Sequence, residues 1–241
     1  AFSYTKEKQL IEDFNLKVKE GQRIAIVGPT GCGKTTIINL LMRFYDVNQG
    51  RVLVDDIDVR NLNLQTLRGN IGIAMQDVFL FSDTIEGNIA YGNPDCTFEQ
   101  VQAAAKIANA DEFIREMPEG YDTIIGERGV GLSGGQKQRA AVTRALMMDP
   151  KLLLADEPTG ALDSKATDEL LQVFSELHAA GQTILMVTHS TKAASHASRV
   201  LFIKDGEVFH QLYRGNSTNE EMYQKIANTL TLLTTGGDEN E

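Results

Sequence analysis

A glycine-rich segment near the start of the chain constrains the fold more than any other feature. It fits the pattern G-x-x-x-x-G-K-[ST] and consists of Gly28, Pro29, Thr30, Gly31, Cys32, Gly33, Lys34 and Thr35. The apolar segment 23–27 precedes it, and a helical pattern with an apolar face, 34–45, follows it. Strand, loop and helix in this order predict a site that binds phosphate through backbone N–H groups and the positive end of the helix.

Individual side chains of this segment have separate expected roles in nucleotide binding. The Lys34 ammonium supplies a charge for the β- and γ-phosphates, the Thr35 hydroxyl is a ligand for Mg²⁺, and Thr36 completes the nucleotide-binding set. A chance glycine turn is the alternative interpretation, but the strand before the segment and the helix after it favour a phosphate site. The expected cofactors are therefore ATP and Mg²⁺.

Strand patterns and helix patterns alternate along the chain. Strands are expected at 14–18, 23–27, 51–54, 71–75, 152–155, 183–188, 200–204 and 207–213. Helices are expected at 34–45, 98–109, 110–117, 136–148, 164–180, 191–197 and 220–233. The pair Asp55 and Asp56 is expected to turn a hairpin. This alternation predicts an α/β fold with a mainly parallel sheet, interrupted by a helical insertion that begins near residue 84.

The composition excludes other classes of protein. Acidic side chains number 33 and basic ones 23, and the net charge of −10 argues against a nucleic-acid partner. No apolar run approaches the roughly 20 residues that a membrane-spanning helix needs. The two cysteines, Cys32 and Cys96, are too few for a disulfide scaffold, so we expect reduced thiols.

Two consecutive carboxylates, Asp156 and Glu157, follow the apolar segment 152–155. We expect Asp156, at the end of the strand, to hold Mg²⁺, and Glu157 to polarise the attacking water. An acidic turn after a strand is the alternative, and the pair gains weight only beside a phosphate loop. Metal-dependent hydrolysis without a nucleotide is a further alternative, which no His, Cys and Asp cluster of the sequence supports.

A second glycine-rich segment lies at the start of the helix expected at 136–148. It consists of Leu132, Ser133, Gly134, Gly135 and Gln136. A serine hydroxyl and backbone N–H groups at a helix start make a second site for an anion. A glycine-rich helix cap is the alternative interpretation, and it would be favoured for this segment alone.

Together these motifs resemble the ATPase domain of ATP-binding cassette (ABC) transporters over nearly the whole chain. Segment 28–35 is similar to the Walker A motif of this family, 152–156 to its Walker B motif, and 132–136 to its LSGGQ signature. The resemblance implies a P-loop NTPase core with a mainly parallel sheet, an antiparallel β subdomain and a helical subdomain. The implied bounds are about 1–80 and 150–215 for the core with the β subdomain, about 81–149 for the helical subdomain, and about 216–241 for a C-terminal helix and tail.

The same resemblance assigns roles to residues outside these motifs. Gln76 lies where the Q-loop glutamine of the family binds Mg²⁺ and couples it to the transmembrane partner, and Asp163 lies in the D-loop. His189 matches the switch histidine that reaches the γ-phosphate, and Tyr4 resembles the aromatic residue that stacks on adenine. The implied catalytic residues are Glu157, His189 and Gln76. In isolation, Tyr4 would be interpreted as surface packing and His189 as an ordinary strand-end histidine.

The resemblance also implies two partners. One is a second copy of the ATPase domain, bound head to tail, so that ATP lies between the Walker A segment of one copy and the LSGGQ segment of the other. This arrangement explains why one chain carries two phosphate-facing segments. The other partner is a transmembrane permease domain, which places the chain in the cytoplasm at the inner face of the cell membrane.

Different parts of the chain resemble different branches of the family. Segments 2–4, 76–92 and 121–139 are similar to exporters with fused membrane and ATPase domains. Segments 153–163 and 215–226 are similar to separate ATPase subunits of the macrolide and antimicrobial-peptide transporter branch. A chimera, natural or engineered, and a divergent natural member are both consistent with this pattern.

The leading functional interpretation is an ATP-hydrolysing motor of an export-type transporter. One alternative is an isolated or chimeric domain that binds nucleotide without transport. Another is a non-transport ABC ATPase that acts on ribosomes or DNA, against which the net charge of −10 argues.

Overall fold

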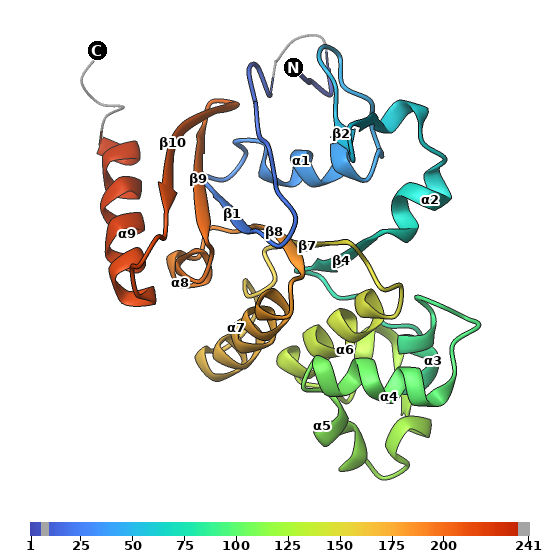
Figure 1. The fold of residues 1–241 in the computed structure, drawn as a ribbon. Coiled ribbons are helices and arrows are strands. Elements are labelled where there is room, and N and C mark those ends of the chain that lie inside the picture. Colours follow the sequence, from blue (N-terminus) through green and yellow to red (C-terminus); the bar gives the residue numbers. More distant parts are fainter. Residues whose placement is uncertain (6–9, 236–241) are drawn as a thin grey trace. The chain divides into compact units, whose positions relative to one another are not determined.

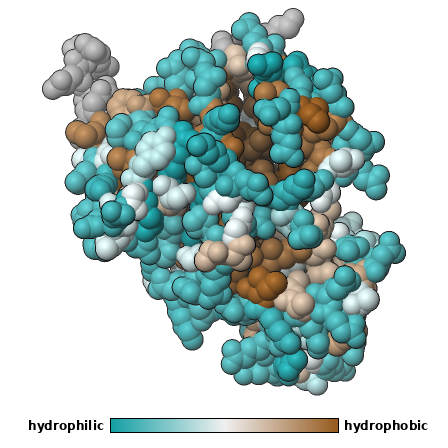
Figure 2. Space-filling model, in the orientation of Figure 1, coloured by the Kyte–Doolittle hydropathy of each residue, from teal (hydrophilic) through white to brown (hydrophobic). Residues whose placement is uncertain are grey.

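The computed structural model describes residues 1–5 and 10–235, and the chain divides into two compact units (Figure 1). The first unit comprises Ala1–Leu67 and Ile184–Glu241, and the second comprises Arg68–Thr183. On the face drawn in Figure 2, hydrophilic side chains cover most of the surface and apolar side chains gather in a few places. None of the helices within the described ranges is long and apolar enough to cross a membrane.

Four strands form the sheet of the first unit in the order β10, β9, β1, β8. The central strand β1 (Arg23–Val27) pairs in parallel with β8 (Thr183–Val187) and with β9 (Arg199–Lys204), and β10 (Glu207–Tyr213) pairs with β9 in antiparallel fashion. Every residue of β1 and β8 is buried, as is typical of parallel strands covered on both faces. Because these strands run parallel, the segments that follow them leave the same edge of the sheet.

The first unit also contains several helices and a hairpin. These elements are α1 (Lys34–Leu41), β2 (Leu53–Val54), β3 (Ile57–Asp58), the 3-10 turn η1 (Val59–Asn61), the first part of α2 (Leu64–Gly69), α8 (Thr191–Ser195) and α9 (Asn219–Thr235). Asp55 and Asp56 turn the hairpin with φ angles of 49° and 62°, as predicted. The helix α9 lies alongside the sheet (Figure 1), where Met222 and Ile226 join Phe202 of β9 in one apolar cluster.

Two parallel strands, β4 (Ile71–Met75) and β7 (Leu152–Asp156), pair in the second unit. The helix α6 (Gly134–Leu146) lies directly against β4. A Cβ atom at Gly72 would stand 3.0 Å from the carbonyl oxygen and 3.2 Å from the Cβ of Ala145. Glycine at position 72 therefore permits the short distance between strand and helix.

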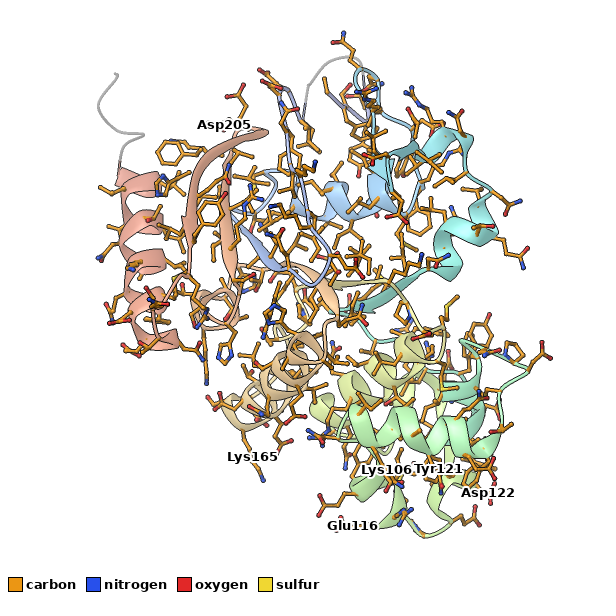
Figure 3. The ribbon with its side chains drawn as sticks, in the orientation of Figure 1. Lys106, Glu116, Tyr121, Asp122, Lys165 and Asp205 are labelled. Carbon is orange, nitrogen blue, oxygen red and sulfur yellow. The ribbon has the colours of Figure 1, made fainter. Side chains whose placement is uncertain are left out.

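A helical segment of the second unit has its own apolar core. Its elements are β5 (Asp83–Thr84), α3 (Ile85–Ala90), α4 (Phe98–Ile107), α5 (Asp111–Arg115), the 3-10 turn η2 (Gly120–Asp122), β6 (Ile124–Ile125) and the 3-10 turn η3 (Glu127–Gly129). Ile85, Ile89 and Ile114 are fully buried in this core. The hydroxyl of Tyr121 (Figure 3) donates to Asp111 Oδ1 at 2.7 Å, and burial together with this hydrogen bond raises the pKa of Tyr121.

The predicted α/β class, with a mainly parallel sheet and smaller antiparallel sheets, is confirmed. The predicted bounds 23–27, 71–75 and 207–213 agree with β1, β4 and β10, and most other predicted elements are present with ends shifted by one or two residues. The helices α2 and α3 and the short strands β3, β5 and β6 were not predicted.

Two predicted elements differ from the structure. The strand predicted at 14–18 is wrong: its residues alternate between half-buried and exposed, but in the described chain no strand pairs with this segment. The helix predicted at 34–45 ends at Leu41, because Arg43 adopts a left-handed φ of 52°. In the first case an alternating pattern occurs in a segment without strand pairing among the described residues. In the second the apolar face of the helix pattern extends beyond the last helical residue.

Candidate active site

The predicted phosphate loop connects β1 to α1 in the first unit. At each of its glycines, a side chain would either collide with neighbouring atoms or be strained by the backbone conformation. A Cβ atom at Gly28 would collide with the carbonyl oxygen of Ile203 and would stand 2.8 Å from Cys32 Sγ. Gly31 and Gly33 have φ angles of 83° and 98°, which favour glycine. Gly33 is also the N-cap of α1, so the loop leads directly into the positive end of that helix.

Lys34 braces this loop from within. Its side chain is only 8% exposed, and Nζ donates to the carbonyl oxygens of Gly28 at 2.9 Å and Pro29 at 3.0 Å. Thr30, Gly31 and Thr35 are exposed. The loop therefore holds a cation at its centre and keeps exposed positions around it, which is the arrangement expected for binding phosphate oxygens.

Cys32 lies inside the loop as a buried thiol. Burial raises the pKa of Cys32, while the charge of Lys34, whose Nζ lies 4.0 Å from Sγ, lowers it. The net effect is a raised pKa, so the thiol stays protonated and a poor nucleophile at neutral pH. We therefore interpret Cys32 as a packing residue of the loop.

Tyr4 lies against the helix that follows the loop. Its hydroxyl is 3.1 Å from Thr36 Oγ1 and accepts a hydrogen bond from Asn39 Nδ2 at 3.2 Å. The ring contacts Phe2 and Tyr45 edge to face, with centroids 4.9 and 5.0 Å away. Tyr4 is 48% exposed, so part of its surface is accessible to a ligand. The structure thus brings the predicted adenine-stacking residue next to the predicted nucleotide-binding residue Thr36.

Tyr4→Ala is expected to weaken ATP binding by about 1–2 kcal/mol, within the range for one base stacked on an aromatic ring. Tyr4→Phe keeps the ring and removes only the hydroxyl contacts, so the affinity should fall less. Calorimetric titration with ATP measures both changes, and inorganic triphosphate, which has no base, serves as the control ligand. An unchanged ATP affinity in Tyr4→Ala would exclude stacking, and equal losses in the two variants would assign the effect to the hydroxyl.

His189 is another exposed candidate of the first unit and follows β8. The backbone N–H of Thr188 donates to the carbonyl oxygen of Ile26 at 3.0 Å, so the ladder between β8 and β1 continues to the residue before His189. The topology therefore brings His189 and the start of the phosphate loop to one edge of the sheet. A contact with the γ-phosphate stays a prediction.

In the second unit, Gln76 and the two carboxylates follow adjacent parallel strands. Met75 at the end of β4 is the register partner of Asp156 at the end of β7, so Gln76 and Glu157 leave the same sheet edge. Asp156 is only 7% exposed, whereas Gln76 is exposed. A Cβ atom at Gly160 would stand 2.9 Å from Gln76 Nε2, so this side chain lies against the loop that follows β7.

Glu157 has a left-handed φ of 47°, and this turns the chain sharply directly after Asp156. A positive φ is uncommon for a residue with a side chain and recurs at functional sites. The sharp turn supports the expectation that the two neighbouring carboxylates have different roles. The assignment of Glu157 as general base stays a prediction.

The signature segment begins α6 with a capping box. Ser133 Oγ accepts from the N–H of Gln136 at 3.3 Å, and Gln136 Oε1 accepts from the N–H of Ser133 at 2.9 Å. The helix-cap interpretation is thus present in the structure, and the N–H groups at this helix start are also those suited to an anion. A Cβ atom at Gly135 would stand 2.8 Å from the Cβ of Ala166, so glycine allows α7 (Ser164–Ala179) to approach. Asp163 caps α7 by accepting from the N–H of Ala166 at 2.8 Å.

A surface hollow of about 210 Å³ lies beside this helix start. It is lined by Ser133, Gly135, Gln136, Arg139, Asp163, Lys165, Ala166 and Glu169. Arg139 forms an ion pair with Glu169 and lies over the ring of Phe113, 5.3 Å from its centroid. Lys165 is 88% exposed and extends from the first turn of α7 (Figure 3). The hollow is therefore polar, with the exposed Lys165 ammonium 3.9 Å from Glu169 Oε1 at its margin and the predicted residues Ser133, Gln136 and Asp163 in its wall.

The predicted metal ligands fit Mg²⁺ by their chemistry. Thr35, Asp156 and Gln76 offer a hydroxyl, a carboxylate and an amide oxygen, the hard donors that Mg²⁺ prefers. Within residues 1–5 and 10–235, no group of three or more His, Cys, Asp or Glu side chains could enclose a metal ion. A cation held by a few protein oxygens together with phosphates suits this donor set better than one held by protein alone.

Comparisons with known proteins agree with these motifs. A family model described as ABC transporter matches residues 11–160. The chain is 44% identical over 209 residues to the "Putative multidrug export ATP-binding/permease protein YgaD" of Bacillus subtilis, covering 86% of this chain and 36% of that protein. It is 46% identical over 208 residues to the "Iron-sulfur clusters transporter atm1, mitochondrial" of Aspergillus fumigatus, covering 86% of this chain and 29% of that protein.

A solved structure supports the same relationship at the level of the fold. It is titled "Structure of a bacterial Atm1-family ABC exporter with ATP bound", superposes with a TM-score of 0.82 and is 38% identical in sequence. The similarity covers 94% of this chain and 41% of that one. The chain thus spans about a third of the length of the two relatives named above.

Proposed function

Because this chain belongs to the ABC transporter family and is similar to the ATP-binding part of its exporters, we propose that it is the motor domain of an exporter. ATPase domains of this family hydrolyse ATP in a cycle coupled to transport. The observation that carries the proposal is the braced phosphate loop, in which Lys34 donates to the carbonyls of Gly28 and Pro29 beneath exposed Thr30, Gly31 and Thr35.

In the proposed reaction, some groups bind ATP and others act on its terminal phosphate. Lys34 and the loop N–H groups bind the β- and γ-phosphates, and Tyr4 orients the base. When bound, Mg²⁺ neutralises charge on the phosphate oxygens, and Thr35, Asp156 and Gln76 would hold it. Glu157 accepts a proton from the attacking water.

His189 is assigned to the γ-phosphate. It follows β8 at the sheet edge where the phosphate loop follows β1, which supports this role. Its imidazole would donate a hydrogen bond to a γ-phosphate oxygen and stabilise the charge that this group carries in the transition state.

The dimer proposal explains a second feature of the chain. The phosphate loop belongs to the first unit, whereas the helix start at Ser133 and the polar hollow beside it belong to the second. A head-to-tail dimer would allow the second anion site of one copy to complete the nucleotide site of the other. Asp163, which lines the same hollow as Ser133, would then lie at the dimer interface.

An exposed aromatic surface supports a permease partner. Phe79 and Tyr91 are 51% and 63% exposed, and both contact the ring of Phe81, at centroid distances of 5.1 and 4.6 Å. Arg144 fixes this surface by donating to the Phe79 carbonyl at 3.0 Å and by lying over Phe81. Exposed aromatic clusters typically mark protein interfaces. Since the relative YgaD carries ATP-binding and permease parts, we propose that a permease covers this surface at the cytoplasmic face of the membrane.

The rate of ATP hydrolysis as a function of protein concentration tests the proposal. For the isolated chain at saturating ATP, the rate should rise with the square of the concentration while the monomer predominates, because two copies build each site. When the domain is joined to its permease, two copies are held together, and the rate should become proportional to concentration. A linear rise for the isolated chain would exclude the shared site, and an absent rate would favour a domain that only binds nucleotide.

A further inference from the structure

Gln138 is a buried polar side chain of α6 to which the proposed ATP chemistry assigns no role. Only 3% of its surface is exposed. Its Nε2 donates to the carbonyl oxygens of Met75 at 2.8 Å and Gln76 at 3.1 Å. These consecutive carbonyls lie where β4 ends and the Gln76 loop begins. One amide group thus fixes the backbone of a predicted metal ligand.

The hydrogen bonds themselves fix the orientation of this amide. Two carbonyl oxygens face the same atom, and only the NH₂ group can donate to both. In the described ranges, Gln138 Oε1 is buried and has no hydrogen-bond partner. An unpaired buried acceptor lowers the stability of a fold. A contribution to stability therefore does not by itself account for a glutamine at this position.

The far end of α6 is attached to the same strand by packing. Ala145 lies seven residues after Gln138, on the same face of the helix. It contacts β4 at Gly72, where a Cβ atom would stand 3.0 Å from the Ala145 carbonyl oxygen. The helix is therefore held on β4 at two points: close packing at Gly72 near the start of the strand, and the Gln138 hydrogen bonds at its end.

This attachment connects three of the predicted motifs inside the second unit. The helix that carries Gln138 begins at the signature residue Ser133. The backbone that Gln138 holds belongs to Gln76, and the Gln76 side chain lies against Gly160 in the loop after Glu157. A shift of the Gln76 backbone must therefore either carry the start of α6 with it or break the Gln138 hydrogen bonds.

We propose that Gln138 is a positioning residue for ATP hydrolysis, which locks the Gln76 loop to the helix that begins at Ser133. In the proposed dimer, Gln76 faces the nucleotide of its own copy and Ser133 faces the nucleotide of the partner. Gln138 would hold Gln76 and Ser133 in one fixed geometry, so that the two nucleotide sites adopt their active arrangement at the same time. This inference rests on the proposed function.

Gln138→Met tests the inference because methionine has a similar length and fills the site but cannot donate. It also removes the unpaired acceptor, which limits the effect on folding. The rate at saturating ATP should fall by about 10- to 100-fold, the scale for a misplaced reacting group, while the KM for ATP changes by less than about threefold. A second readout is independent of hydrolysis: in the Glu157→Gln background, the ATP concentration needed for dimer formation should rise about tenfold.

Gln182→Met is the matched control. Gln182 Nε2 also donates to two backbone carbonyls of the second unit, those of Pro150 at 3.0 Å and Thr183 at 3.3 Å. These acceptors flank the start of β7 and the start of β8, away from the edge that carries Gln76 and Glu157. Gln182→Met should therefore reproduce any general loss of stability without the loss of rate or of dimer. Equal rates and equal dimer formation in the two variants would overturn the positioning role.

A double-mutant cycle with Gln76→Ala separates a positioning role from a structural one. If Gln138 acts through Gln76, Gln138→Met should change the rate by less than about twofold once Gln76 is alanine. If the double variant instead loses rate by the product of the two single losses, the inference would be overturned. Should Gln138→Met unfold, Gln138→Asn replaces it, since the shorter amide cannot span both carbonyls, and the same comparisons apply. Second-order hydrolysis by the wild type reports on the proposed function separately, so failure of the positioning role leaves that function intact.

Discussion

Glu157→Gln is expected to slow ATP hydrolysis by roughly 10²–10⁴-fold, the usual contribution of a positioned acid–base group. Glutamine has the shape of glutamate but cannot accept the proton of the attacking water. The turn at this position, with its φ of 47°, places the same demand on both residues, so the loop should keep its conformation. ATP binding should survive, because the phosphate loop belongs to the other unit and is unchanged.

The same variant should accumulate as a dimer in ATP. Uncleaved ATP would stay between two copies, and removal of a negative charge near the γ-phosphate should favour closure. Adding Ser133→Arg should dissolve this dimer, because Ser133 lies in the wall of the hollow that the partner's nucleotide would approach. Size-exclusion chromatography with and without ATP, alongside a hydrolysis assay, measures both effects.

Glu116→Gln provides the control for the lost charge. Glu116 lies at the end of α5 in the helical segment (Figure 3), and its substitution changes the net charge by the same amount. Its hydrolysis rate and monomeric state should match those of the wild type. A Glu157→Gln protein with the wild-type rate would exclude Glu157 as the base, and one that stays monomeric in saturating ATP would remove support for the shared site.

Lys34→Ala is expected to weaken ATP binding severely, by about 10- to 150-fold. This range corresponds to one charged hydrogen bond of about 1.5–3 kcal/mol. The substitution also removes the donors that hold the Gly28 and Pro29 carbonyls, so the loop loses its brace as well as its cation. AMP lacks the β- and γ-phosphates, and its affinity should change by less than about threefold.

Calorimetric titration with ATP and AMP distinguishes a local loss from unfolding. Lys106→Ala is the matched control, because Lys106 is an exposed lysine in the last turn of α4 (Figure 3) and its removal changes the net charge equally. It should bind ATP as the wild type does. An unchanged ATP affinity in Lys34→Ala would contradict the phosphate-loop assignment, whereas a parallel loss of AMP binding would indicate that the fold is damaged.

The sequence alone determined the features that depend on neighbouring residues. The apolar runs of β1 and β4 set their bounds, and the Asp55-Asp56 pair set the hairpin turn. The spacing of glycines and Lys34 was sufficient to predict a phosphate loop, because the chemistry of such a loop lies in consecutive backbone groups. The order of the motifs was sufficient to indicate the family.

Contacts between distant residues were decided only by the tertiary structure. The strand pair of Asp83 with Ile125 joins segments whose two-residue length carries no periodic pattern, and the segment 14–18 has the alternation of a strand without a pairing partner. Tyr4 was predicted to stack on adenine, but its contact with Asn39 could not be read from spacing. Gln138 is the clearest case: its position on a helix face was evident, whereas its two acceptors lie more than 60 residues earlier in the chain. A hydrogen bond of this kind depends on how a helix packs against a strand, and local sequence patterns specify which faces are buried but not which polar groups meet there.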